Sequence, residues 1–179
     1  MARLESVFVP DFVGPCGGAP LAQAALGQGW RLALLSTFAG PGCCHGAVGA
    51  AGWAALAQCL ERAEAAGESV LLALHHPPLP PAGDAPPWAG NCLSEPQPLL
   101  ELLQRHACCR VALYGHLHAD VRSTLGSACT AYCTPSTCTQ TRIQSPTWEF
   151  QRELQPGYRL LRLMEAGEHT TEVRRVATN

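Results

Sequence analysis

The sequence lacks several features that would assign it to a broad class of proteins. It contains no lysine, only 15% of its residues are charged, and its formal net charge is -2. This balance argues against a general attraction to nucleic acid or to anionic membrane surfaces. No apolar run approaches the roughly 20 residues that a membrane-spanning helix needs. No basic start leads into an apolar run and a small-residue cleavage site. We therefore expect a cytoplasmic protein with no nucleic-acid and no membrane partner.

The ten cysteines never form a C-x-x-C knuckle, the spacing that is typical of structural zinc sites. Seven of them lie in two adjacent pairs and one loosely spaced trio: Cys43 and Cys44, Cys108 and Cys109, and Cys129, Cys133 and Cys138. We interpret the cysteines as buried free thiols in a reducing compartment. A structural metal site built on them is the alternative.

The middle of the chain alternates short apolar runs with helical patterns, which predicts an α/β fold. A length of 179 residues suits one domain with a substantial core. Strands are expected over 30–38, 69–74 and 110–114, and a helix over 48–66. A second helix is expected from Ser94, because Ser94 and Gln97 fit a capping box. The last two strands and the second helix form a parallel crossover unit.

The two ends of the chain follow other patterns. After Asp120 the apolar residues alternate in segments separated by turns, over 121–125, 128–133, 158–164 and 170–176, which predicts antiparallel hairpins. Residues 1–29 are rich in proline and glycine and are interpreted as an irregular arm.

Four histidines follow the two strands of the crossover unit. His75 and His76 come after strand 69–74, and His116 and His118 come after strand 110–114 within the sequence G-H-L-H. A lone histidine at a strand end is usually an ordinary core or surface residue, but clustered histidines at neighbouring strand ends suit a site. Neutral imidazole is a ligand for borderline metals. We therefore expect the rings of His75, His116 and His118 to converge as metal ligands.

The segments LALHHPPLP, LYGHLH and TPSTCTQ follow one another in an order typical of calcineurin-like metallophosphoesterases. The chain specifically resembles the bacterial class III 3',5'-cyclic-AMP phosphodiesterases. The resemblance implies the C-terminal half of a four-layer α/β/β/α sandwich. It also implies two divalent metal ions, Fe, Mn or Zn, bridged by a carboxylate and by the hydroxide that attacks phosphorus. The implied reaction is hydrolysis of 3',5'-cyclic AMP to 5'-AMP.

The resemblance also assigns roles to the histidines. His75 and His116 would ligate the second metal. His118 would ligate the first metal and contact the phosphate, which makes it the catalytic candidate. His76 matches the second histidine of the family motif and is expected to support the ligands or contact the substrate.

The segment 134–140 is expected to contact the cyclic nucleotide or another small phosphodiester. Ser136, Thr137 and Gln140 would line the purine pocket. Serine and threonine after a strand also satisfy the backbone of their own turn. Both readings of Ser136 and Thr137 stay open.

The amino-terminal motifs of the family, D-x-H, G-D and G-N-H-D, are missing from the sequence. In the family they supply carboxylate, histidine and asparagine ligands, including the bridging aspartate. We therefore expect residues 1–179 to be a partial, inactive phosphoesterase domain whose N-terminal metal-binding half is absent. Uncovered sheet surface in such a domain should favour self-association. The alternatives are a non-catalytic binding or regulatory module with a vestigial metal site, and a hydrolase of another phosphodiester.

Overall fold

The computed structural model describes residues 19–81, 88–143, 145 and 147–177. These residues form eight strands, two α-helices and two short 3-10 helices. In chain order they are β1 (Leu21–Gly27), β2 (Trp30–Leu35), α1 (Ala50–Ala65), β3 (Ser69–Ala73), η1 (Ala89–Asn91), α2 (Gln97–Arg105), β4 (Cys109–Tyr114), β5 (Val121–Leu125), β6 (Cys129–Cys133), β7 (Gly157–Leu163), η2 (Glu165–Gly167) and β8 (His169–Arg175). None of the helices in the described ranges is both long enough and apolar enough to cross a membrane.

Six of the strands form one sheet in the order β1-β2-β3-β4-β6-β5. The inner strands β2, β3, β4 and β6 are parallel to one another. The edge strands β1 and β5 are antiparallel to their neighbours β2 and β6. The parallel pairing of β3 with β4 across α2 confirms the predicted crossover unit. The predicted hairpins are also present, as the antiparallel pairs β5–β6 and β7–β8.

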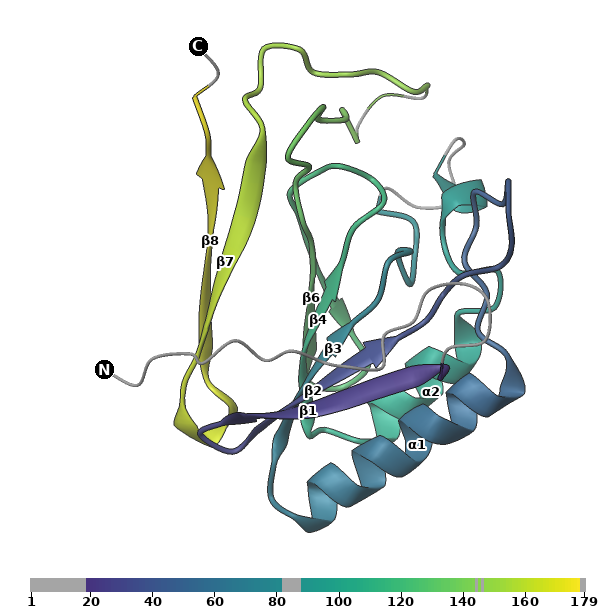
Figure 1. Ribbon diagram of the computed structural model, residues 1–179, viewed down its shortest axis with the longest axis vertical. Coiled ribbons are helices and arrows are strands. Elements are labelled where there is room, and N and C mark those ends of the chain that lie inside the picture. Colours follow the sequence, from purple (N-terminus) through teal and green to yellow (C-terminus); the bar gives the residue numbers. More distant parts are fainter. Residues whose placement is uncertain (1–18, 82–87, 144, 146, 178–179) are drawn as a thin grey trace.

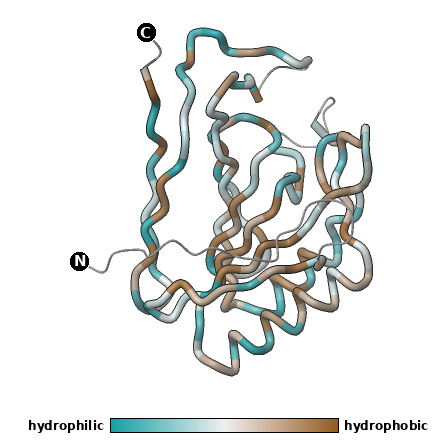
Figure 2. The backbone as a smooth tube through the Cα atoms, in the orientation of Figure 1, coloured by the Kyte–Doolittle hydropathy of each residue, from teal (hydrophilic) through white to brown (hydrophobic). Residues whose placement is uncertain are grey.

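Both helices cover the same face of the six-stranded sheet (Figure 1). Each helix packs on the strands through its leucine side chains. Leu56 and Leu60 of α1 and Leu99 and Leu103 of α2 are almost fully buried. Hydrophobic residues, brown in the backbone tube, are concentrated where the strands cross the helices (Figure 2). This is the larger of the two apolar cores.

The β7–β8 hairpin lies on the other side of the sheet (Figure 1). Leu161 and Leu163 of β7 pack against a smaller apolar cluster on that face, which contains Trp30 and Tyr132. The indole Nε1 of Trp30 donates a hydrogen bond of 2.6 Å to the carbonyl oxygen of Met164. The fold is therefore mixed α/β, with a helix layer, a six-stranded sheet and a two-stranded sheet in succession. The described residues contain no second helix layer.

Two expectations from the sequence need correction. Residues 21–27 are not an irregular arm but the edge strand β1, paired antiparallel with β2; residues 1–18 of the expected arm lie outside the described residues. The capping box is also wrong, because α2 begins at Gln97 and its N-cap residue, Pro96, makes no side-chain cap. The backbone N–H of Ser94 instead donates to the carbonyl oxygen of Gly46, which holds this segment out of the helix.

The cysteines are only partly as expected. All nine described cysteines are free thiols, and five of them are buried. Cys43, Cys44 and Cys138 are exposed, so the interpretation as buried thiols is wrong for these three.

Candidate metal centre

The histidines lie where two parallel strands of the central sheet end. The pairing of β3 with β4 continues past both strands, because the N–H of Gly115 donates to the carbonyl oxygen of His75 at 3.0 Å. His75 and His76 therefore follow β3 at the same edge of the sheet at which His116 follows β4. This edge of a parallel sheet is where α/β folds usually place their sites.

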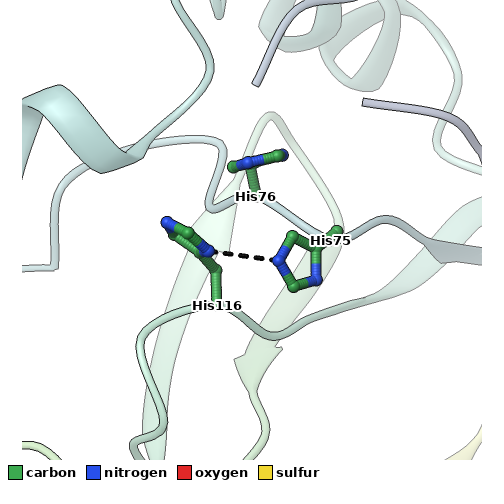
Figure 3. A group of neighbouring side chains, drawn as sticks. All are labelled: His75, His76 and His116. Atoms are coloured by element: carbon green, nitrogen blue, oxygen red, sulfur yellow. Dashed lines mark hydrogen bonds between the residues drawn. The ribbon is translucent and has the colours of Figure 1, made fainter. Parts of the chain in front are cut away.

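Three imidazoles meet at this edge: those of His75, His76 and His116 (Figure 3). One ring nitrogen of each lies within 4.8 Å of the others. The ring centroids are 4.7 to 5.0 Å apart. His75 Nε2 and His116 Nδ1 are 3.1 Å apart, as a hydrogen-bonded pair. We call these three residues the histidine group.

The spacing within the histidine group suits a shared ion. Two nitrogens that are each about 2.1 Å from one metal, at an angle of about 90 to 109°, lie about 3.0 to 3.4 Å apart. The 3.1 Å between His75 Nε2 and His116 Nδ1 falls in that range. A divalent cation could therefore replace the proton that now joins the two rings without a large movement of either side chain.

Neighbouring side chains orient two of the rings. His116 Nε2 lies 3.2 Å from Oδ1 of Asn91, so an N–H on Nε2 leaves the lone pair of Nδ1 facing His75. His76 is buried, and its Nδ1 lies 2.8 Å from the hydroxyl of Thr37. A Cβ on Gly46 would lie 2.6 Å from Cγ of His76, so the backbone of Gly46 packs directly on that ring.

The three rings favour the neutral form that a metal ligand needs. Burial, together with the nearby His116, His75 and His45, lowers the pKa of His76 to about 4, against a raising effect of Thr37. Burial also lowers the pKa of His75, with a smaller contribution from His118. The pKa of His116 is lowered by burial and by His75, against a raising effect of the backbone of Cys44. Near pH 7 the histidine group is therefore uncharged and has lone pairs available.

The G-H-L-H turn has an unusual backbone. His116 has φ 66° and His118 has φ 52°, a left-handed conformation that costs a residue with a side chain about 1 to 3 kcal/mol. Leu117, between them, is fully buried, and its N–H donates to the carbonyl oxygen of Gly115 at 2.7 Å. Packing of Leu117 in the core thus holds the turn that presents His116 to His75.

The remaining predicted site residues are divided between two places. His118 lies outside the histidine group and lines a separate pocket of about 440 Å³, which Gln140 also lines. The hydroxyl of Ser136 accepts the N–H of Cys138 at 3.0 Å, as in a turn. Neither Ser136 nor the exposed Thr137 lines that pocket. Of the three histidines expected to converge, the structure thus brings His75 and His116 together, with His76 in place of His118.

The composition of the histidine group limits its chemistry. Within the described ranges it contains no carboxylate and no cysteine. Asp120, close to His118 in the sequence, is paired with the guanidinium of Arg159. Sequence reasoning missed Asn91, Thr37 and Gly46, because each comes from a segment distant in the sequence, outside the long strands and helices, and no local motif marks it.

Comparisons with known proteins show which proteins the chain is similar to. No protein-family model matches the chain. It is 39% identical over 113 residues to a 3',5'-cyclic-nucleotide phosphodiesterase of Nostoc sp., covering 59% of this chain and 38% of that protein. It is 36% identical over 115 residues to the 3',5'-cyclic adenosine monophosphate phosphodiesterase CpdA of Pseudomonas aeruginosa, covering 63% of this chain and 40% of that protein. The chain thus spans less than half the length of these two relatives.

The fold has a counterpart among solved structures. A dimetal phosphatase from Danio rerio superposes with a TM-score of 0.60 at 15% sequence identity, over 87% of this chain and 57% of that one. At this identity the likeness concerns the fold alone. The chain is therefore a homologue of proteins named cyclic nucleotide phosphodiesterases, and it has a fold similar to that of a dimetal phosphatase.

Proposed function

We propose that this chain provides one side of the metal centre of a cyclic nucleotide phosphodiesterase, a phosphoric diester hydrolase. The observation that carries the proposal is the histidine group, in which His75 and His116 present ring nitrogens 3.1 Å apart at adjoining strand ends. The names of the homologues support a cyclic nucleotide as the substrate. The free thiols of the described residues agree with a reducing, cytoplasmic location.

In this proposal His75 Nε2 and His116 Nδ1 hold one divalent ion, Fe, Mn or Zn. Such an ion supplies Lewis acidity and lowers the pKa of a bound water. Asn91 keeps His116 in the required tautomer by accepting its Nε2–H. His76 closes the group from its buried side and supports the orientation of its two neighbours.

His118 and Gln140 are proposed to contact the substrate. Both line the pocket of about 440 Å³, which His75, His76 and His116 do not line. His118 would donate a hydrogen bond to a phosphate oxygen. Ser136 and Thr137 are proposed to act at the rim of the substrate site, where the bond from Cys138 to Ser136 shapes the turn.

We further propose that the isolated chain binds metal without hydrolysing cyclic AMP. Three imidazoles without a carboxylate are not expected to hold two ions at the separation of about 3.5 to 4 Å that two-metal hydrolysis needs. Hydrolysis would then require further metal ligands, of the kind that the unmatched part of the relatives would supply. A chain that binds metal without hydrolysis would be a non-catalytic module. The all-histidine composition of the histidine group favours this alternative.

The test is metal binding followed by an assay of turnover. The purified chain is stripped with EDTA, dialysed against Zn²⁺ or Mn²⁺, and analysed for bound metal. We expect about one ion per chain. His75→Ala and His116→Ala should each weaken binding by at least the 10- to 100-fold typical of supporting residues. His106→Ala is the control, because His106 contacts Glu64 and lies outside the histidine group.

The possible results separate the readings. Failure to bind metal, or binding that survives both histidine variants, overturns the proposed centre. Binding that is lost on thiol alkylation and kept in the histidine variants would favour a cysteine site. Turnover of cyclic AMP by the isolated chain would overturn the proposed inactivity.

A further inference from the structure

Two adjacent thiols lie on the surface in the loop between β2 and α1. Cys43 and Cys44 are both exposed, and both are free thiols. Among the described cysteines only Cys138 is also exposed, and in the sequence it stands alone between Thr137 and Thr139. Within the described part of the chain, Cys43 and Cys44 are therefore the one exposed pair of neighbouring thiols.

Backbone hydrogen bonds hold this pair in a closed turn. The N–H of Cys43 donates to the carbonyl oxygen of Gly40 at 3.3 Å, the bond that closes a β-turn. Just after the pair, the N–H of Gly46 donates to the carbonyl oxygen of Cys92 at 3.0 Å. Gly46 also packs on the ring of His76. The two thiols are thus held near the histidine group without being part of it.

Adjacent cysteines are poorly placed to form a disulfide with each other. Consecutive Cα atoms are about 3.8 Å apart across a trans peptide, whereas a disulfide usually joins Cα atoms about 4.4 to 6.8 Å apart. A bond between Cys43 and Cys44 would strain the turn, so the pair should persist as two thiols. A larger atom that binds both sulfurs avoids this strain, because the sulfurs then need not bond to each other.

We propose that Cys43 and Cys44 form a binding site for trivalent arsenic, a soft centre that takes both sulfurs at once. Thiolates select soft partners. The second sulfur binds within the same molecule, which can raise the affinity over that of a single thiol by about 100- to 10,000-fold. With an arsenical R–As(OH)₂, two As–O bonds break and two As–S bonds form. The two thiol protons leave with the hydroxyl groups as two water molecules, and arsenic stays trivalent, so no oxidant or reductant takes part.

The probe is phenylarsine oxide, which hydrates to such an arsenical. The reduced full chain is mixed with an equimolar amount in EDTA and then challenged with increasing glutathione, a monothiol, and intact mass spectrometry measures the adduct that remains. We expect a single phenylarsine on each chain. Cys43→Ser and Cys44→Ser should each lose it at a glutathione concentration at least about 100-fold lower than the wild type does. Cys138→Ser is the control, because it removes an exposed thiol outside the pair, and it should keep the resistance of the wild type.

Alkylation of the wild type gives a second measurement that needs no variant. The bound arsenical should protect Cys43 and Cys44 from iodoacetamide and leave Cys138 reactive, as mapped by proteolysis and mass spectrometry. The inference is overturned if no adduct forms, if the protected cysteines are others, or if glutathione strips the wild type and Cys43→Ser equally. Because EDTA keeps metal away from the histidine group, these outcomes are independent of the proposed metal centre.

Discussion

His116 is held from both sides, with Nδ1 towards His75 and Nε2 towards Asn91. Asn91 should therefore affect metal affinity through His116, without contacting the metal itself. We expect Asn91→Leu to weaken metal binding by about 10- to 100-fold, because His116 loses the acceptor that fixes its tautomer. Asn91→Asp should retain the affinity, since a carboxylate accepts the same proton. Competition with a chromophoric chelator measures both variants, and equal losses in the two would contradict the role.

Gly46 gives a second test of the same centre through packing. A Cβ at Gly46 would lie 2.6 to 2.7 Å from three atoms of the imidazole side chain of His76, and overpacking typically costs about 1 to 3 kcal/mol. We expect Gly46→Ala to lower the free energy of unfolding by that amount and to weaken metal binding. Gly90→Ala is the control, because a Cβ there meets nothing within 4 Å among the described residues. Denaturant titration measures the stability, and an unchanged Gly46→Ala would contradict the packing.

Some residues of the centre could be predicted and others could not. His75 and His116 were predictable because parallel strands end at one edge, whatever the details of the loops. His118 does not join the histidine group, although it lies near enough to lower the pKa of His75 and of His116, and it lines a pocket that the group does not line. Asn91 approaches His116 through the 3-10 helix η1, and no spacing in the sequence indicates that approach.

Among the elements, the β5–β6 turn is fixed against α2 by a glycine. Gly126 has φ 58°, and a Cβ there would lie 2.5 Å from the backbone carbon of Leu103. We expect Gly126→Ala to destabilise the fold by more than the roughly 1 to 2 kcal/mol of a left-handed residue. Gly67→Ala is matched, because Gly67 has φ 67° and a Cβ there meets no atom of the described part of the chain within 4 Å. Urea unfolding compares the two, and equal losses would show that the contact with α2 adds nothing.

The β7–β8 hairpin should detach from the sheet more easily in acid. His169 of β8 lies 3.0 Å from the hydroxyl of Tyr132 on β6. Burial lowers the pKa of His169 below its ordinary 6.5, with further lowering by Arg122 and Arg110. The unfolded chain therefore binds the proton more readily. Stability from the neutral ring is complete above pH 6.5 and is lost as the pH falls towards the folded-state pKa.

The variant His169→Gln isolates this contribution from that of the histidine group. The difference in unfolding free energy between wild type and variant should shrink, or reverse in sign, when the pH is lowered from 7.5 to 5. Chemical denaturation at both pH values measures it. A difference that is constant across this range would contradict the lowered pKa of His169.

The predicted boundaries of an element match the structure where the apolar pattern and the turn residues indicate the same end. This is so for β3 and for α1, which ends just before Gly67. They failed where tertiary contacts decide. β1 has little intrinsic signal, and its pairing with β2 through the turn at Gly27 and Gly29 makes it a strand. The start of α2 is set by the bond from Ser94 to Gly46, which joins residues 48 positions apart.

For the whole molecule, the arrangement of layers leaves apolar surface next to the centre. A cavity of about 450 Å³ lies at the ends of β2 and β3 and is lined mainly by apolar residues, among them Leu34 and Phe38, beside His75 and His76. Phe38 is 49% exposed. β1 is an edge strand with no charged side chain and with no second partner among the described residues. Such edges and patches tend to recruit another chain.

We expect the purified chain to self-associate at micromolar concentration and to bind a hydrophobic dye. Ala25 is exposed on β1, so Ala25→Lys places a charge on the edge and should shift the chain towards monomer without reducing its stability. Gln58→Lys adds the same charge on the exposed side of α1 and should leave association unchanged. Sedimentation velocity over a concentration series measures the shift. A general effect of added charge would shift Ala25→Lys and Gln58→Lys towards monomer to the same extent. Equal shifts in the two variants would therefore mean that β1 is not the surface through which the chain self-associates. A wild-type monomer that binds no dye would mean that the chain covers its own apolar surface.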